Sequence, residues 1–321
     1  MHMADALLSP AVGGTLWAAS AAVVARSARR LGGDGDERLA PLMGMTGAFV
    51  FAAQMVNFAI PGTGSSGHLG GGLLLALLLG PHAAVVVMTS VLLVQALFFA
   101  DGGLLALGAN VWNLGVVPAL VAAPLVARPL MARRREAAGI VLGAVAALQL
   151  GALGVVAQTA ASGVAALPLL PFLAAMLPIH LAIGLVEGAA TLALWRVLRD
   201  RRPESELAAP TALRPTGRLL AVLLLATGLT AGALSWLASE RPDGLEWSVE
   251  RAAQGVPAAE GRVHSLLARA QRHLAAFPSY APRGAEPSRG ATSAAGLAGA
   301  AATLGLVALG ALALRRLGPR G

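Results

Sequence analysis

The sequence predicts an all-α polytopic membrane protein, and three observations support this prediction. Hydrophobic residues make up 56% of the 321 residues, whereas charged residues make up only 12%. The mean hydropathy is +0.71, far above that of an ordinary water-soluble domain. The apolar residues also form long runs separated by short polar or arginine-rich segments, as expected of helices that cross a bilayer.

Eight apolar stretches reach the length of about 20 residues that a helix needs to cross roughly 30 Å of hydrocarbon. They lie near residues 9–26, 40–59, 82–100, 104–127, 138–162, 170–198, 217–239 and 294–314. A ninth, shorter stretch at 69–79 lies between His68 and the Gly80-Pro81 break. A helix over this stretch rises only about 16 Å and is too short to span the hydrocarbon alone.

The distribution of arginine predicts the sidedness of these helices. All 24 basic residues are arginine, and four clusters of them follow the stretches 9–26, 104–127, 170–198 and 294–314. Positive charge is enriched in cytoplasmic loops, and the four clusters share one side only if 69–79 and 82–100 each cross the membrane. We therefore expect nine crossings of the cell membrane, with the N-terminus outside and the C-terminus inside.

The short stretch at 69–79 requires an unusual loop before it. Residues 61–67, PGTGSSG, precede His68 and consist almost entirely of small residues. Because the next helix is short, this loop is expected to enter the membrane from outside, where irregular backbone is tolerated only inside protein or beside a cavity. His68 is then expected on the same face as the N-terminus, at a helix start whose partial positive charge disfavours imidazolium.

Composition excludes several classes of function. The sequence contains neither cysteine nor lysine, so thiolate metal sites and disulfides are absent, as is the phosphate-binding loop of P-loop ATPases. The net charge of +8 arises from arginines beside apolar stretches, so membrane topology explains it better than nucleic-acid binding. The sequence has no HExxH motif of zinc hydrolases, and we do not expect an enzyme.

The first ten residues, MHMADALLSP, contain a possible metal chelate. The Met1 amine, the His2 amide nitrogen and the His2 imidazole can close two small chelate rings around one ion and leave a fourth in-plane position open. Such nitrogen-rich sites suit Ni(II) and Cu(II) and can hold Co(II). The first apolar stretch is not preceded by a basic region, so removal of the segment as a signal peptide is not expected.

The competing interpretation is that His2 is incidental at a frayed end and that His68 is an ordinary interfacial residue. Their shared sidedness favours metal binding. Asn57, Ser65 and Ser66, in or beside the loop before His68, are candidates for orienting a metal ligand by hydrogen bonding.

His180 and Glu187 are polar residues inside the stretch 170–198. They are seven residues apart, about 10 Å along a helix, and share one helical face. Buried polar residues in membrane helices serve either as contacts between helices or as part of a pathway. The pair therefore fits a structural packing face or a proton relay.

Residues 199–216 are rich in arginine, glutamate and proline and are predicted to be a cytoplasmic linker. The linker divides the chain into a metal-binding unit, 1–198, and a two-span unit, 217–321. Between the two spans lies an outer segment, 240–292, in which apolar residues near 261–277 recur with helical spacing. His264 and His273 lie on opposite sides of that helix and are expected to be solvated.

Four segments resemble a known family. They are MHMADALLSP at the N-terminus, AAQMVNFAIPGTGSSGHLGGGLLLALLLGP at 52–81, LFFADGGLLALGANVWNLGVV at 97–117 and IHLAIGLVEGAAT at 179–191. They resemble the substrate-binding (S) components of nickel and cobalt energy-coupling-factor transporters, the CbiM/NikM type. The resemblance implies a bundle of about seven helices with a re-entrant outer loop. It also implies a metal ion held by the Met1 amine, the His2 amide and imidazole nitrogens, and the His68 side chain.

Two positions depart from the family pattern. Ala6-Leu7 replaces the usual Gly-aromatic pair, and the loop before His68 is one residue longer than the common PGGTSGH form. Either departure affects loop geometry or metal preference, but neither removes a donor.

Residues 217–321 are similar to the small two-span N component of these transporters, in its PDGLE form. The similarity is carried by Pro242, Asp243, Gly244, Leu245, Glu246 and Trp247, and more weakly by FPSY at 277–280. It implies that this segment assists loading of the metal from outside.

The resemblance implies uptake of Ni(II) or Co(II) by a metal-capturing membrane subunit. A chain without Walker motifs needs a separate transmembrane coupling (T) component and two ATPase subunits for such uptake. The alternative is a stand-alone, proton-coupled secondary metal transporter that uses His180 and Glu187.

Overall fold

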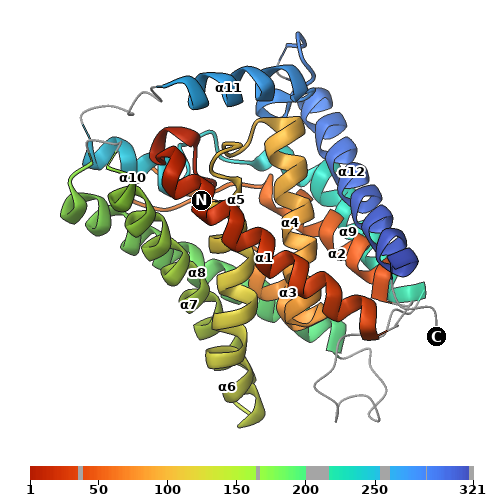
Figure 1. Ribbon diagram of the computed structural model, residues 1–321. Coiled ribbons are helices and arrows are strands. Elements are labelled where there is room, and N and C mark those ends of the chain that lie inside the picture. Colours follow the sequence, from red (N-terminus) through yellow and green to blue (C-terminus); the bar gives the residue numbers. More distant parts are fainter. Residues whose placement is uncertain (35–38, 164–166, 200–216, 254–260, 287, 318–321) are drawn as a thin grey trace.

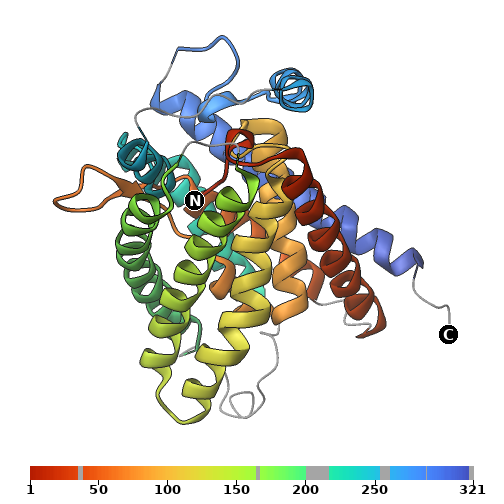
Figure 2. The ribbon, with the colours of Figure 1, turned by 60° about the vertical axis from the view of Figure 1, so that its left-hand side comes forward.

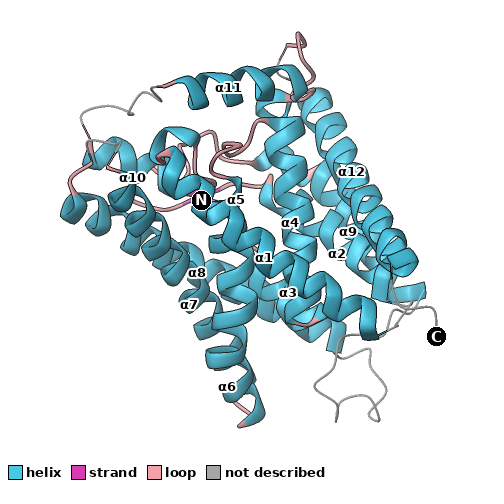
Figure 3. Ribbon diagram, in the orientation of Figure 1, coloured by secondary structure: helices cyan, strands magenta, loops and turns pink. Residues whose placement is uncertain are grey.

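The computed structural model describes residues 1–34, 39–163, 167–199, 217–253, 261–286 and 288–317. Within these ranges the chain is almost entirely helical (Figure 3), which confirms the predicted all-α class. Residues 200–216 of the predicted linker lie outside the described residues.

The N-terminal unit forms a bundle of helices. After a short 3-10 turn at Asp5–Leu7, the bundle consists of α1 (Pro10–Asp34), α2 (Leu39–Gln54), α3 (Gly72–Leu79), α4 (Pro81–Val94), α5 (Leu107–Val111), α6 (Arg128–Ala132), α7 (Glu136–Ser162) and α8 (Leu169–Arg199). Two π-helical segments, η2 (Gln95–Phe99) and η3 (Trp112–Ala127), continue α4 and α5. Pro118 and Pro124 lie inside η3, where their missing N–H groups interrupt the regular α-helical hydrogen bonds.

Among the described residues, five helices are long and apolar enough to cross a membrane. They cover Pro81–Phe99, Leu107–Ala132, Glu136–Ser162, Leu169–Val197 and Arg289–Ala313. The expected short helix is α3, which has only 8 residues. It is bounded by Gly71 and Gly80, whose φ angles of +76° and +86° suit glycine. The number of nine crossings is not established by these helices and stays a prediction.

The C-terminal unit packs directly on this bundle. It consists of α9 (Gly217–Gly232), η5 (Leu234–Leu237), α10 (Gly244–Ala252), α11 (Arg262–Leu274), η6 (Pro278–Tyr280) and α12 (Arg289–Leu317). Helix α12 packs against α2 and α9, and α10 packs against α8. In Figures 1 and 2, α11 lies across the end of the bundle nearest the N-terminus, and α6 lies at the opposite end.

The amphipathic helix expected near 261–277 is α11. The expectation that both of its histidines are solvated is wrong for His264. His273 is exposed as expected, whereas His264 is only 3% exposed. The Nε2 atom of His264 lies 2.9 Å from the Leu8 carbonyl oxygen. The prediction failed because this face of α11 is covered by the N-terminal segment, which sequence periodicity does not show.

The loop before His68 is a β-hairpin. Strands β1 (Phe58–Ala59) and β2 (Ser66–Gly67) pair in antiparallel fashion, and the hairpin projects from the left of the view in Figure 2. Its tip is exposed at Pro61, Gly62 and Gly64, whereas the segment 65–68 is buried. The buried base of the hairpin thus places His68 in the interior of the protein. Entry of this loop into the membrane stays a prediction.

Candidate metal site

The N-terminal segment is held in an extended path across the loop that joins η2 to α5. The Met3 N–H donates to Asn110 Oδ1 at 2.7 Å, and the Met3 carbonyl accepts from Gly103 N at 2.9 Å. Asp5 Oδ1 accepts the Ala106 N–H at 3.0 Å. At Gly103, a Cβ atom would overlap the Asp5 carboxylate. The fit of these residues fixes the backbone of the first residues.

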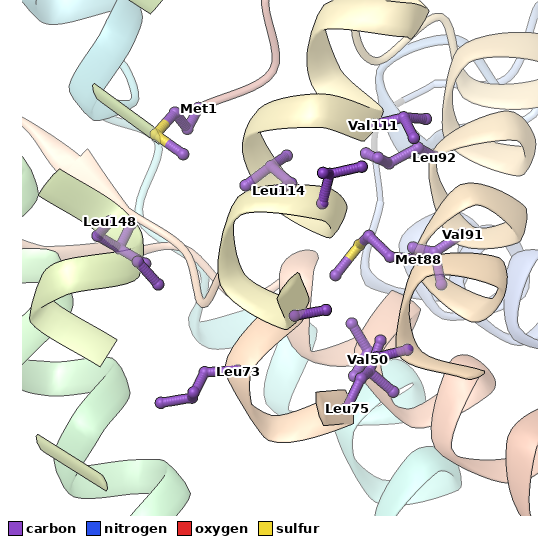
Figure 4. Packing of buried hydrophobic residues seen from close by; sticks show 14 of the residues in the cluster. Met1, Val50, Leu73, Leu75, Met88, Val91, Leu92, Val111, Leu114 and Leu148 are labelled. Carbon is purple, nitrogen blue, oxygen red and sulfur yellow. The ribbon is translucent and has the colours of Figure 1, made fainter. Parts of the chain in front are cut away.

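The Met1 side chain anchors the other end of this segment in the core. It is only 5% exposed and belongs to the main hydrophobic cluster, together with Leu114 and Leu148 (Figure 4). A Cβ atom added at Gly151 of α7 would come within 2.9 Å of the Met1 Cε atom. Burial of the thioether therefore leaves the amine little freedom.

The Met1 amine lies between two side chains that are distant in sequence. Its nitrogen is 2.9 Å from His68 Nε2, across a separation of 67 residues. It also donates to Asp243 Oδ2 at 2.7 Å. The N-terminal amine, the hairpin and the C-terminal unit therefore meet at one point.

His68 presents a lone pair to the amine. Its Nδ1 atom lies 3.0 Å from the Leu69 carbonyl oxygen. Because a carbonyl only accepts, Nδ1 carries the proton and Nε2 is the acceptor. Burial, with the ammonium group of Met1 beside the ring, lowers the pKa of His68. The ring is thus a neutral nitrogen donor.

The backbone after His68 is held from two sides. Glu187 of α8 accepts the Gly70 and Gly71 N–H groups at 2.7 and 3.1 Å. Gln54 Nε2 of α2 donates to the Gly70 carbonyl at 2.8 Å. These buried contacts fix the position from which His68 projects.

The His2 ring stacks on the His68 ring, with centroids 4.9 Å apart and an interplanar angle of 8°. Its Nδ1 atom lies 3.2 Å from Asp101 Oδ1. Its Nε2 atom is buried and has no hydrogen-bond partner within the described part of the chain. Buried polar atoms without a partner are rare in folded proteins, so the His2 ring is not fully satisfied in this orientation.

Asp101 is itself fixed by the C-terminal unit, since Tyr280 donates its hydroxyl to Asp101 Oδ2 at 2.5 Å. Burial raises the pKa of Asp101. His2 and the hydrogen bond from Tyr280 lower it by more, so the pKa lies below its usual range.

Asp243 caps helix α10 with one carboxylate oxygen and contacts the Met1 amine with the other. Oδ1 accepts the Glu246 N–H at 2.8 Å, as an N-cap residue does, and Oδ2 accepts from the amine. Burial raises the pKa of Asp243. The ammonium group of Met1 and His68 lower it by more, so the pKa lies below its usual range. The carboxylate is therefore ionised at neutral pH.

The PDGLE segment docks closely on the hairpin and on α8. Ser66 N donates to the Pro242 carbonyl at 2.8 Å, and Trp247 Nε1 donates to the Thr63 carbonyl at 3.1 Å. A Cβ atom added at Gly244 would lie 2.6 Å from Ile179 Cγ2. Only glycine permits this approach of α10 to α8 without rearrangement.

Comparison with known proteins identifies the family of this chain. The family model of the CbiM cobalt uptake substrate-specific transmembrane region matches residues 2–205. The chain belongs to the CbiM family. The PDGLE domain matches residues 217–316. The family assignment confirms the resemblance found in the sequence.

Curated relatives and a solved structure extend the comparison. A putative fused nickel transport protein NikMN of Archaeoglobus fulgidus is 33% identical over 95% of this chain and 96% of the relative. A putative metal transport protein of Haloquadratum walsbyi is 36% identical over 64% of this chain and 92% of the relative. A crystal structure of a truncated transition metal transporter is 27% identical, has a TM-score of 0.52, and covers 63% of this chain and all of that one.

In this CbiM-family chain the metal donors proposed from sequence, Met1, His2 and His68, lie together. Among the described residues, no group of three or more His, Cys, Asp or Glu side chains could hold a metal ion.

The residues predicted to orient a metal ligand, Asn57, Ser65 and Ser66, make hydrogen bonds to the C-terminal unit or within the hairpin. The Asn57 carbonyl accepts the Ser239 N–H at 2.8 Å. Ser66 Oγ donates to the Arg241 carbonyl at 2.7 Å, and Ser65 Oγ donates to the Ser66 carbonyl at 3.1 Å. Asn57 and Ser66 thus join the hairpin to the C-terminal unit.

His180 and Glu187 make separate contacts on α8. His180 Nδ1 lies 2.8 Å from the Met176 carbonyl, whereas Glu187 binds the backbone after His68. Both have a structural partner in the folded chain.

Sequence reasoning missed Asp101, Asn110 and Tyr280 as parts of the site. Asp101 is followed by two glycines at the end of an apolar stretch, and Tyr280 is the only tyrosine of the chain. Both features were available signals, but only the fold shows that the two residues meet.

Proposed function

We propose that this CbiM-family protein is the metal-capturing membrane subunit of an energy-coupling-factor transporter for Ni(II) or Co(II). The observation that carries this proposal is the separation of 2.9 Å between the Met1 amine nitrogen and His68 Nε2. Relatives named as nickel and cobalt transport proteins support the choice of ions. The ion is the substrate of the protein.

The separation of these two nitrogens suits a bound ion. Two neighbouring nitrogen donors, each about 2.0 Å from a metal in square-planar geometry, lie about 2.8 Å apart. An ion that replaces the proton shared by the amine and His68 therefore needs little movement of either donor.

His2 completes the chelate after a local change. A six-membered ring that includes the His2 amide nitrogen closes through Nδ1, the atom that faces Asp101 in this structure. We infer that the imidazole turns about its Cβ–Cγ bond on loading, so that Nδ1 faces the ion and the Nε2–H group faces Asp101. A carboxylate that accepts the second N–H of a metal-bound histidine orients the ring and raises its basicity.

The transporter context follows from what the sequence lacks. Without lysine the chain has no Walker A loop, so within an energy-coupling-factor transporter it needs a separate T component and two ATPase subunits. The donors, α10 and α11 lie toward one end of the bundle and α6 lies at the other (Figure 1). This arrangement supports an N-terminus outside and a C-terminus inside the cell membrane.

We also retain the division of the chain into a metal-binding unit, 1–198, a linker, 199–216, and a PDGLE unit, 217–321. In this division the segment from Pro242 to Trp247 assists loading of the ion. Its contacts with the amine and the hairpin support that role.

An added residue before Met1 tests the chelate. The wild-type chain with a free Met1 amine is expected to bind one Ni(II) or Co(II) per molecule in detergent. One extra residue before Met1, His2→Ala or His68→Ala should each abolish tight binding, because each removes or displaces a donor. His273→Ala, at an exposed histidine of α11, is the matched control. Unchanged affinity in the extended protein would show that the amine is not a ligand.

The competing function is proton-coupled transport through His180 and Glu187. The structural partners of both residues favour a packing role over a relay. Uptake should stop when the ATPase partners are deleted. If uptake survives that deletion and collapses with the proton gradient, the coupling-factor assignment is wrong.

A further inference from the structure

The C-terminal unit reaches both halves of the N-terminal chelate. Asp243 at the start of α10 contacts the Met1 amine at 2.7 Å. Tyr280 of η6 contacts Asp101, which in turn contacts the His2 ring. Two separate segments of the C-terminal unit thus reach the proposed donors. Asp243 contacts the Met1 amine directly, and Tyr280 reaches the His2 ring through Asp101.

Further contacts hold the loop that carries Asp101 against the same unit. Gln271 Nε2 of α11 donates to the carbonyls of Ala96 and Gly102 at 2.9 and 2.7 Å. Phe277 N donates to the Phe98 carbonyl at 2.9 Å. Since these bonds involve the backbone on either side of Asp101, the carboxylate is positioned by α11 and η6 together.

The backbone at Tyr280 is strained in a way that serves this contact. Ser279 and Tyr280 have φ angles of +52° and +59°, in the left-handed region that non-glycine residues rarely adopt. The Tyr280 ring packs 5.0 Å from that of Phe99 and 6.4 Å from that of Phe51, measured between ring centroids. Packing and the hydrogen bond to Asp101 together maintain the unfavourable conformation, and such strain concentrates at functional positions.

The two carboxylates are more exposed to solvent than the donor residues that they contact. The side chains of Met1 and His2 are 3% and 5% exposed, whereas those of Asp243 and Asp101 are 22% and 27% exposed. The carboxylates therefore lie on the solvent side of the donors, where two negative charges attract an incoming dication.

We propose that Asp243 and Tyr280 are the residues through which the C-terminal unit positions the chelate for its ion. This inference rests on the proposed function and assigns the loading role to two side chains. A metal-bound amine keeps two N–H groups, one of which can donate to Asp243. Asp101, fixed by Tyr280, accepts from the metal-bound His2 ring. Neither Asp243 nor Tyr280 is a metal ligand.

Conservative variants of the full-length protein test this proposal. Asp243→Asn and Tyr280→Phe should each weaken Ni(II) binding by about 10- to 100-fold, the range found when partners of metal ligands are removed. Binding should stay at one ion per protein, and the visible absorption band of bound Ni(II) should stay at the wild-type position. Asp243→Glu should recover part of the lost affinity because it restores the charge.

Two matched controls separate positioning from general damage. Glu250→Gln removes an exposed carboxylate of α10 outside the segment from Pro242 to Trp247, and His273→Gln changes an exposed side chain of α11. Both should bind Ni(II) within about twofold of wild type. Thermal unfolding of each variant in detergent, with metal removed, identifies any that fail to fold.

Three outcomes would overturn the inference. Asp243→Asn and Tyr280→Phe could match the two controls in affinity, Asp243→Glu could bind no better than Asp243→Asn, or the absorption band could shift in Asp243→Asn, which would make Asp243 a ligand. In each case wild type would still bind one ion and His68→Ala would not, so the proposed function would stand. Failure of wild type to bind would overturn both.

Discussion

At the residue scale, the site depends on which atoms of His68 are free. The Leu69 carbonyl holds the proton on Nδ1 and leaves the lone pair of Nε2 toward the amine. Burial keeps the ring neutral, because the ammonium group beside it and the loss of solvent both oppose a second positive charge. Two of the proposed donors, the Met1 amine and His68 Nε2, thus already lie side by side in the folded chain.

The lowered pKa of His68 predicts how stability depends on pH. In the unfolded chain a histidine titrates at about pH 6.5, whereas native His68 stays neutral at that pH. Below about pH 6.5 the unfolded state therefore binds a proton that the native state does not, and native stability falls as the pH falls. The midpoint of thermal unfolding of the metal-free protein should drop between about pH 7.5 and pH 5.5.

His68→Gln should reduce this drop, because glutamine does not titrate. His273→Gln, changed at an exposed position, should keep the wild-type slope. An identical slope in wild type and His68→Gln would contradict the assignment of His68 as a buried neutral ring.

At the element scale, close backbone contacts decide how the helices around the site pack. A Cβ atom added at Gly72, at the start of α3, would lie 2.3 Å from the Leu114 carbonyl oxygen and 2.8 Å from Pro118. Helix α3 therefore lies directly on η3 because residue 72 lacks a side chain. The hairpin base and His68 precede α3 by only a few residues and move with it.

Gly72→Ala is expected to destabilise the protein by about 1–3 kcal/mol, since the added methyl group forces α3 away from η3. Metal affinity should fall as well, because His68 is displaced. Gly228→Ala in α9 is the control, since nothing lies within 4 Å of a Cβ atom there. Thermal unfolding and Ni(II) titration of both variants measure the effects. Equal stability of the two would show that α3 shifts freely.

At the scale of the whole molecule, the two units form one body around the N-terminus. Helix α12 packs on α2 of the first unit, and α10 packs on α8. The N-terminal amine, a proposed metal donor, lies between His68 of the first unit and Asp243 of the second. The second unit therefore contributes Asp243 and Tyr280 to the surroundings of the proposed site.

The predicted sidedness is testable because the chain has no cysteine. Arg269→Cys on α11 and Ala132→Cys at the end of α6 introduce single thiols at exposed positions. A membrane-impermeant maleimide added to intact cells should label residue 269 only, and residue 132 should react after the membrane is opened. The reverse pattern would place the N-terminus inside.

Several features of the fold were predictable from patterns that act locally. Long apolar runs give α4, α7, α8 and α12, because a bilayer leaves backbone groups no partner other than their own helix. The short helix after His68 was predictable from the Gly80-Pro81 break. The expectation of a solvated His264 was wrong, because the covering segment comes from residue 8.

The sequence by itself determined the helical class and the approximate helix positions, and it predicted Met1, His2 and His68 as the residues that supply nitrogen donors to a metal ion. These depend on composition, on apolar run length and on residues whose chemistry is specific. Only the tertiary structure decided that Asp243 contacts Met1, that Asp101 contacts His2 and that Tyr280 contacts Asp101. Their contacts join residues from opposite ends of the chain, and a contact at that separation depends on how helices pack, which no local pattern specifies.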